Sequence, residues 1–187
     1  MSCTEISVVD RLSLREIASG SILHGLEAAE PLLPAIEKVS HRLRGLGACF
    51  VTLQQQEHLR GCIGTLDAYR PLAIDVAANA FSAAFCDPRF EKLTREEWPR
   101  CEFEISVLSQ PAILPVKTEE ELLAILRPGI DGLILKWQRH RATFLPSVWE
   151  SLSTPEEFIA ALKQKAGLPP GFWAQDMEVF VYQTQTF

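Results

Sequence analysis

The sequence predicts an α+β fold of 187 residues with a largely antiparallel sheet and flanking helices. Two stretches, 48–66 and 132–146, have the hairpin pattern of two apolar strands around a short polar turn. Each is followed by an amphipathic helical stretch, at 71–86 and 154–166, and then by a strand pattern. The order hairpin, helix, strand thus occurs twice, which predicts an internal repeat. No Pro-, Gly- or Ser-rich linker divides the chain, so we expect one domain spanning residues 1–187.

Start and stop signals place the elements of the first half. Ser13 and Glu16 form a capping-box pattern at the start of the first helix. Pro71 begins the second helix, and Pro88 ends it because a residue before proline disfavours helical geometry. Thr94 opens another capping box ahead of a strand with one apolar face. The expected elements are a helix at 13–29, strands at 48–55 and 58–66, a helix at 71–86 and a strand at 101–111.

The second half is marked in the same way. Thr118 and Glu121 form a capping box, Pro155 stands in the first turn of the next helix, and Gly167 follows its end. The expected elements are a helix at 118–129, a hairpin over 132–146 with its turn near 138–140, a helix at 154–166 and a closing strand at 177–187.

Composition limits the classes of function. A net charge of −6 makes general nucleic-acid binding unlikely, because such binding depends on excess Lys and Arg. No signal peptide pattern and no apolar run of about 20 residues is present, so we expect a cytoplasmic protein without a membrane span.

The cysteines indicate free thiols in a reducing compartment. Their number is odd, and no two form a C-x-x-C pair. The four histidines show no i, i+4 pairing, so we expect neither a metal site nor a cofactor. The cysteines are Cys3, Cys49, Cys62, Cys86 and Cys101.

The stretch "EHLRGCIGTL", residues 57–66, carries the strongest candidate site. Glycine is costly in a strand, so Gly61 and Gly64 indicate that something approaches the backbone closely. Regular alternation puts Cys62 on a polar face and the intervening residues on the core face. Arg60 would lie about 7 Å from Cys62 along the strand and would favour the nucleophilic thiolate. The polar face is expected to hold His58, Arg60, Cys62 and Gly64, and the core face Leu59, Gly61, Ile63 and Thr65.

Cys62 is therefore a candidate nucleophile, and the alternative is a cysteine that packs as a small apolar residue. His58 stands too far along an extended strand to serve as a directly bonded base. Thr143 holds the place of Cys62 in the second half, which makes its hydroxyl a candidate partner if the two strands lie near each other. Its alternative role is that of an ordinary strand threonine.

The stretch "FCDPRF" also has two interpretations. Asp87 is either a turn residue that accepts hydrogen bonds from nearby amides or part of a binding site. Arg89 either pairs with Asp87 or Glu91 at the surface, or lies beside Arg60 and clamps an anionic substrate group.

With these motifs the chain resembles the AMMECR-type domain family. The resemblance covers about residues 12–184. Among the members of the family, the chain is most similar to the short prokaryotic ones, known as protein A of the AmmeMemoRadiSam system. The motifs are "FVTL" at 50–53, "LRGCIGT" at 59–65, "DPRF" at 87–90, "EISVLSQP" at 104–111, "IDGLIL" at 130–135, "RATFLPSVW" at 141–149 and "KQKAGLP" at 163–169.

The resemblance implies a fold and a site but no defined reaction. It implies two unequal lobes, with the LRGCIG segment near the cleft between them, and a Memo-type protein and a radical-SAM protein as partners. This chain lacks a C-x-x-x-C-x-x-C motif, so iron–sulfur chemistry would belong to the partner. The site positions that the resemblance implies are Leu59, Arg60, Gly61, Cys62, Ile63, Gly64, Asp87, Pro88, Arg89 and Phe90.

Two functions of different classes fit the sequence. In the first, Cys62 is the nucleophile of an enzyme or modifying component, and Arg60 and Arg89 hold an anionic part of its substrate. In the second, the domain is a non-catalytic adaptor, the glycines permit close packing and the cysteine is inert. An accessible, reactive thiol would separate the first from the second.

Overall fold

A computed structural model describes residues 5–187, so Cys3 lies outside the described residues. The chain forms two compact units, each with its own apolar core. The first comprises the chain up to Leu108 together with Gln185–Phe187, and the second comprises Ser109–Thr184.

The first unit is a four-stranded sheet in the order β10-β5-β2-β3, in which β2 pairs antiparallel with both β5 and β3. Its helices are α1 (Val8–Ala28), η1 (Ile36–Lys38), α2 (His41–Arg44), α3 (Leu72–Phe85) and η2 (Trp98–Arg100). Its strands are β1 (Leu46–Gly47), β2 (Cys49–Gln55), β3 (His58–Gly64), β4 (Arg70–Pro71), β5 (Cys101–Leu108) and β10 (Thr184–Thr186).

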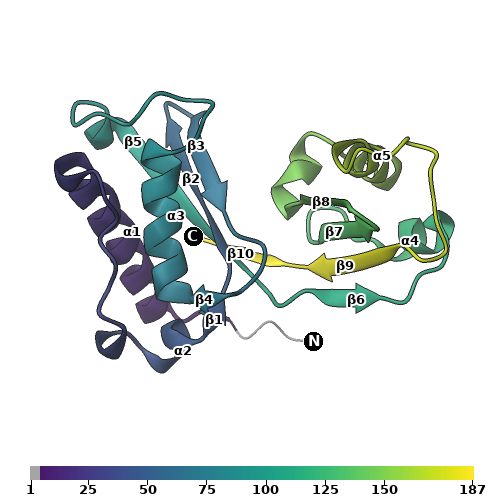
Figure 1. Cartoon of the computed structure of the whole chain (residues 1–187), viewed down its shortest axis with the longest axis horizontal. Helices are drawn as coiled ribbons and strands as arrows, with labels where there is room; N and C mark the ends of the chain where they lie inside the picture. Colours follow the sequence, from purple (N-terminus) through teal and green to yellow (C-terminus); the bar gives the residue numbers. More distant parts are fainter. Residues whose placement is uncertain (1–4) are drawn as a thin grey trace. The chain divides into compact units, whose positions relative to one another are not determined.

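Helices α1 and α3 pack together on one face of this sheet (Figure 1). Their apolar side chains meet alternate residues of β2, such as Val51 and Leu53, which are fully buried. The hairpin β2–β3 turns through Gln56 and Glu57, both in the left-handed region with φ of 51° and 63°. Two adjacent left-handed residues are typical of the tight turn that matches the twist of paired strands. The predicted hairpin at 48–66 is confirmed.

Helix α1 begins five residues earlier than the predicted start at residue 13. Ser7 is its N-cap, and its side-chain oxygen accepts a hydrogen bond from the Asp10 N–H at 3.1 Å. The pattern of Ser13 and Glu16 therefore lies inside the helix, where the same residue types occur without capping anything.

The second unit has a four-stranded sheet in the order β6-β9-β7-β8. In its core the rings of Trp149 and Phe158 stack with centroids 3.9 Å apart, and the buried Lys163 ammonium donates to Glu119 at 2.7 Å. Its elements are β6 (Ala112–Leu114), α4 (Glu119–Ile125), β7 (Gly132–Trp137), β8 (His140–Phe144), η3 (Pro146–Glu150), α5 (Pro155–Lys165) and β9 (Glu178–Tyr182).

The predicted repeat is present in both the order of elements and the order of strands. The hairpin, helix and strand of the first unit are β2, β3, α3 and β5, and those of the second are β7, β8, α5 and β9. The strand order β5-β2-β3 in one sheet corresponds to β9-β7-β8 in the other. The closing strand predicted at 177–187 is divided: β9 belongs to the second sheet and β10 to the first. Its apolar alternation gave no sign of the break at Gln183.

Among residues 5–187, no helix is both long enough and apolar enough to cross a bilayer. In the same range, no group of three or more His, Cys, Asp or Glu side chains is arranged to hold a metal ion.

Candidate functional site

The candidate site lies on β3, the edge strand of the first sheet. The β2–β3 pairing shifts near its turn, because Leu53 pairs with Gly61 whereas Gln54 pairs with Leu59. Arg60 is the extra residue of this bulge. Leu59 therefore lies with Gln54 on the face away from the helices, and it is 44% exposed. The prediction that Leu59 shares the core face with Gly61 is wrong, because a bulge reverses the alternation of side chains.

Gly61 is required by the close approach of α3. A Cβ atom at this position would overlap the carbonyl oxygen of Ala83, which belongs to the helix backbone and cannot rotate away. Gly64 has a different neighbour, since a Cβ there would overlap the ring of Phe50 and come within 2.6 Å of the Cys49 carbonyl oxygen. The expectation that something approaches the backbone closely at Gly61 is confirmed.

Cys62 points to the face opposite α3, where its side chain is half-buried. The Thr52 hydroxyl, directly across on β2, donates a hydrogen bond to the Cys62 Sγ at 3.3 Å. The Cys62 N–H donates to Asp87 Oδ2 at 2.9 Å, and the Cys62 carbonyl accepts from Arg89 Nη2 at 3.3 Å. Asp87 and Arg89 thus bind the outer edge of β3 as the acceptor and donor of a further strand would.

Asp87 follows directly on α3 and is only 5% exposed. Its carboxylate accepts from the Arg89 side chain at Nε (2.9 Å) and Nη2 (2.7 Å), and from the Arg89 backbone N–H at 3.1 Å. These bonds, first those of the Arg89 side chain, hold the pKa of Asp87 well below its usual range. The pKa of Arg89 is raised in return, chiefly by Asp87 and to a smaller extent by the nearby Cys62 sulfur.

Arg60 is held by a second carboxylate. Its Nε and Nη2 donate to the two carboxylate oxygens of Glu97, each at 3.1 Å, and its side chain is only 12% exposed. The Arg60 side chain lowers the pKa of Glu97, and the backbone N–H of Thr94 contributes further. Phe90 lies near both arginines, with its centroid 6.0 Å from the Arg60 guanidinium carbon and 5.5 Å from that of Arg89.

The structure therefore brings together the predicted residues of both motifs. Hydrogen bonds join Cys62 to Asp87 and Arg89, and the ring of Phe90 lies beside both Arg60 and Arg89. Asp87 accepts from the backbone amides of Cys62 and Arg89, as its turn role predicts, and it also pairs with the Arg89 side chain; its part in a binding site stays a prediction. This pair is half-buried rather than a surface pair, with side-chain exposures of 2% and 54%.

Thr143 lies in the second unit, on β8. Its hydroxyl donates to the Leu133 carbonyl at 2.7 Å and lies 2.9 Å from the Tyr182 hydroxyl. Burial raises the pKa of Tyr182 to about 12. These contacts are those of a strand threonine within its own sheet, and its role beside Cys62 stays a prediction.

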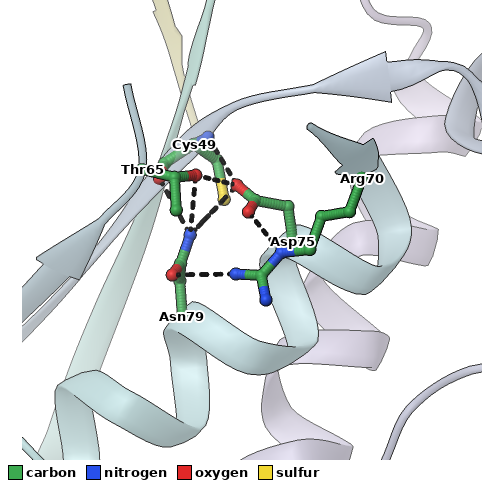
Figure 2. A network of polar contacts seen from close by, with 5 residues as sticks. All are labelled: Cys49, Thr65, Arg70, Asp75 and Asn79. Carbon is green, nitrogen blue, oxygen red and sulfur yellow. Dashed lines mark hydrogen bonds and ion pairs between the residues drawn. The ribbon is translucent and has the colours of Figure 1, made fainter. Parts of the chain in front are cut away.

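A buried polar network on the other face of the first sheet was not predicted (Figure 2). Asp75 Oδ2 accepts from the Cys49 N–H at 2.9 Å and from the Thr65 hydroxyl at 2.6 Å. Asp75 Oδ1 accepts from Arg70 Nε at 2.7 Å, while Asn79 Nδ2 donates to Asp75 Oδ2 at 3.0 Å and to the Cys49 carbonyl at 3.1 Å. Two polar residues four apart within an otherwise apolar helical stripe were the available sequence signal.

The Cys49 thiol lies inside this network. Cys49 is fully buried, and its pKa is raised well above the usual value by burial and then by the negative charge of Asp75. Burial likewise raises the pKa of Cys101. Thr52 and Glu97 were also missed as members of the Cys62 site, because their pairing with β3 depends on tertiary contacts 10 and 37 residues apart in sequence.

Comparison with known proteins agrees with this architecture. The family model described as AMMECR1 matches residues 15–187. Protein MJ0810 of Methanocaldococcus jannaschii is 37% identical over 147 residues, which cover 74% of this chain and 71% of that protein. Protein MK0488 of Methanopyrus kandleri is 31% identical over 95% of this chain and 90% of its own length. The crystal structure of the uncharacterized protein PH0010 from Pyrococcus horikoshii has a TM-score of 0.83 and 30% identity, covering 93% of this chain and 88% of that one.

Proposed function

This chain belongs to the AMMECR1 family, and we propose that it is a cysteine-dependent modifying component in which Cys62 is the nucleophile. The observation that supports this proposal most directly is the environment of the Cys62 thiol. It is half-buried, accepts a hydrogen bond from Thr52 and stands on a backbone fixed on its outer edge by Asp87 and Arg89. Reactive cysteines occupy partly exposed positions beside cations, whereas structural cysteines are buried and inert.

The surrounding groups have separable roles in this proposal. The Thr52 O–H, which donates to the Cys62 sulfur, orients the attacking atom, and Arg89 holds the Cys62 backbone through its carbonyl oxygen. Arg89 uses Nε and Nη2 within the chain and remains 54% exposed, so its Nη1 is suited to an anionic group of the substrate. Arg60 is a positioning residue in this proposal, because its Nε and Nη2 both donate to Glu97.

The proposed step is attack of the Cys62 sulfur on an electrophilic carbon of a small or protein-borne substrate. A sulfur–carbon bond forms, the bond to the leaving group breaks, and the leaving group departs with the electron pair. Within residues 5–187 no histidine ring hydrogen-bonds to the Cys62 thiol, so the thiol proton passes to water before attack. The step requires neither an oxidant nor a reductant.

Alkylation rates measured by peptide mapping test this proposal. Iodoacetamide is expected to label Cys62 in the folded protein much faster than the buried Cys49, and Thr52→Val or Arg89→Gln is expected to slow that labelling. The exposed Cys86 serves as an internal reference for an ordinary surface thiol. A Cys62 that stays unlabelled until the protein unfolds would sink the nucleophile proposal.

A second candidate function is a non-catalytic adaptor. It is favoured by a specific observation. Arg60 and Arg89 both form ion pairs within the first unit, so they also hold the edge strand in place. We propose the Memo-type protein and the radical-SAM protein as its partners on the strength of the sequence resemblance. In this case Cys62→Ser is expected to retain binding of the purified Memo-type protein, whereas Asp87→Ala, which frees the β3 edge, is expected to weaken it.

A further inference from the structure

A separate cavity of about 430 Å³ lies in the first unit, away from the sheet face that carries Cys62. It is bounded by the last turn of α1, the last turn of α3 and the segment 92–95. Its volume falls within the range of roughly 300–1,000 Å³ that is typical of small-ligand sites. We propose that this cavity binds a small amphipathic anion, namely an aliphatic chain that ends in a carboxylate.

The walls of the cavity are apolar and closely packed. Phe81 and Phe85 form one side, with ring centroids 5.0 Å apart, and Leu26 and the buried Leu93 contribute aliphatic surface. Gly25 allows this arrangement, because a Cβ there would overlap the Phe85 ring and lie 2.8 Å from the Phe81 ring. Such walls gain free energy by covering an aliphatic chain and offer little to a sugar or a nucleotide base edge.

Charge at the rim selects the head group. Lys92 lines the cavity, is exposed, and has no ion-pair partner among residues 5–187. Arg95 also lines it and lies 3.6 Å from Glu27, with both side chains more than 60% exposed, so this pair is weakly held. One unpaired cation beside an apolar wall favours a carboxylate, even though the chain as a whole carries a charge of −6.

The polar groups nearest the rim support a single-charged head. The Thr94 hydroxyl oxygen already accepts the Glu97 N–H at 3.3 Å, and the Thr94 N–H donates to Glu97 Oε2 at 2.9 Å. These bonds use the Thr94 oxygen as an acceptor, so its O–H can still donate to a head group that Lys92 binds, with Arg95 available once Glu27 is displaced. A single ammonium matches one carboxylate as a point charge.

Titration calorimetry with dodecanoate, kept below its micelle concentration, is the direct test. We expect saturable binding at one site. Dodecan-1-ol and dodecyltrimethylammonium have the same chain with a neutral and a cationic head, and each is expected to bind about tenfold more weakly or worse, as loss of a charge-assisted contact implies. Equal binding of the three chains, or no saturable binding of dodecanoate, would overturn the proposal.

Variants locate the site. Lys92→Gln is expected to weaken dodecanoate binding about tenfold, while Lys38→Gln, an exposed lysine of the same unit away from the cavity, is expected to leave it unchanged. Leu26→Trp is expected to fill the cavity and abolish binding, provided its thermal melt shows a folded protein. Lys92 is a surface residue, so Lys92→Gln remains informative if Leu26→Trp does not fold.

Cys86 supplies a readout that does not depend on heat. It is exposed and lines the cavity, so bound dodecanoate is expected to slow its alkylation by iodoacetamide about fivefold or more. The alcohol and the ammonium compound at equal concentration are expected to protect it much less. Unchanged Cys86 labelling at saturating dodecanoate would place the ligand elsewhere and contradict the assignment.

Discussion

In the first unit, an aspartate paired with an arginine accepts the backbone N–H of a cysteine at two places, one in the core and one at the edge of the sheet. Asp75 accepts the N–H of Cys49 at 2.9 Å, and Asp87 accepts the N–H of Cys62 at the same distance. Each carboxylate is in turn bound by an arginine, Asp75 by Arg70 and Asp87 by Arg89. In both places an aspartate at one end of α3 fixes the backbone of a cysteine in the sheet.

The Asp75–Cys49 and Asp87–Cys62 arrangements differ in how far their side chains are exposed to solvent, and therefore in how reactive each thiol is expected to be. Asp75 is fully buried and its network closes over Cys49, whose thiol has a raised pKa. Asp87 is also buried, but its arginine is half-exposed and Cys62 lies at the surface of the sheet. The same backbone hydrogen bond therefore holds a fully buried thiol in one case and a half-buried thiol in the other. The free-energy cost of removing each aspartate is expected to differ accordingly.

The largest effect is expected for Asp75→Ala. The substitution leaves the Cys49 N–H and the Thr65 hydroxyl without their acceptor and Arg70 without its carboxylate, inside the core. Breaking a buried ion pair costs about 3–5 kcal/mol of unfolding free energy. Urea unfolding of the variant and the wild type measures this loss. A loss no greater than that of Asp87→Ala would contradict the comparison.

Gly61→Ala is expected to cost about 3 kcal/mol, the upper part of the range for overpacking. Gly61 is adjacent to Cys62 but faces α3, where its new Cβ would overlap the Ala83 carbonyl oxygen. Gly20→Ala in α1 is the matched control, because its Cβ would meet only a Leu32 side-chain atom at 3.9 Å. That change is expected to stabilise the helix by about 0.5–1 kcal/mol. Thermal melts in which both variants match the wild type would remove the packing argument.

The comparison also shows what the sequence could and could not predict. Apolar periodicity and capping residues found the hairpins, the helices after them and the repeat, because these depend on neighbours within a few positions. The spacing of glycines around Cys62 correctly indicated close approach at Gly61. The bulge at Arg60 was not predictable from alternation, so the side of Leu59 was assigned wrongly.

The sequence also could not predict polar contacts between residues that are distant along the chain. Glu97 meets Arg60 only because the segment after α3 returns to β3, and Thr65 meets Asp75 only because β3 ends beside α3. Asp75 lies in the first turn of α3, a position that acidic side chains favour for the helix dipole, so its place in the sequence does not distinguish it from an exposed acid. Its burial, which gives it its energetic weight, is a property of the packed unit.

Asp87→Ala is expected to cost less than Asp75→Ala, about 1–2 kcal/mol. The Cys62 N–H loses its acceptor, but the edge of β3 and the half-exposed Arg89 are open to water, which replaces part of the lost bonding. Chemical denaturation measures the loss. Iodoacetamide labelling of Cys62 in the same variant shows whether the position of the Cys62 thiol depends on the hydrogen bond from its N–H to Asp87, with Cys86 as the reference thiol.

The smallest expected effect is a pH dependence that belongs to Asp87 alone. Arg89 holds the pKa of Asp87 well below that of an unfolded aspartate, which is about 3.9. A carboxyl whose pKa is lower in the folded state stabilises the fold above its unfolded pKa, and this contribution is lost as the pH falls. Other carboxylates with lowered pKa values, such as Glu97, act in the same direction in every variant.

Subtracting a variant that cannot titrate at this position isolates the effect. Asp87→Asn is uncharged at all pH values, so the free-energy gap between wild type and Asp87→Asn is expected to shrink by about 1 kcal/mol from pH 6 to pH 2.5. The gap between wild type and Glu97→Gln, followed in parallel, reports the Arg60 pair in the same way. A free-energy difference between wild type and Asp87→Asn that stays constant over this range would mean that the charge of the Asp87–Arg89 pair does not stabilise the edge strand. The side chain at position 87 would then hold Cys62 through neutral hydrogen bonding alone.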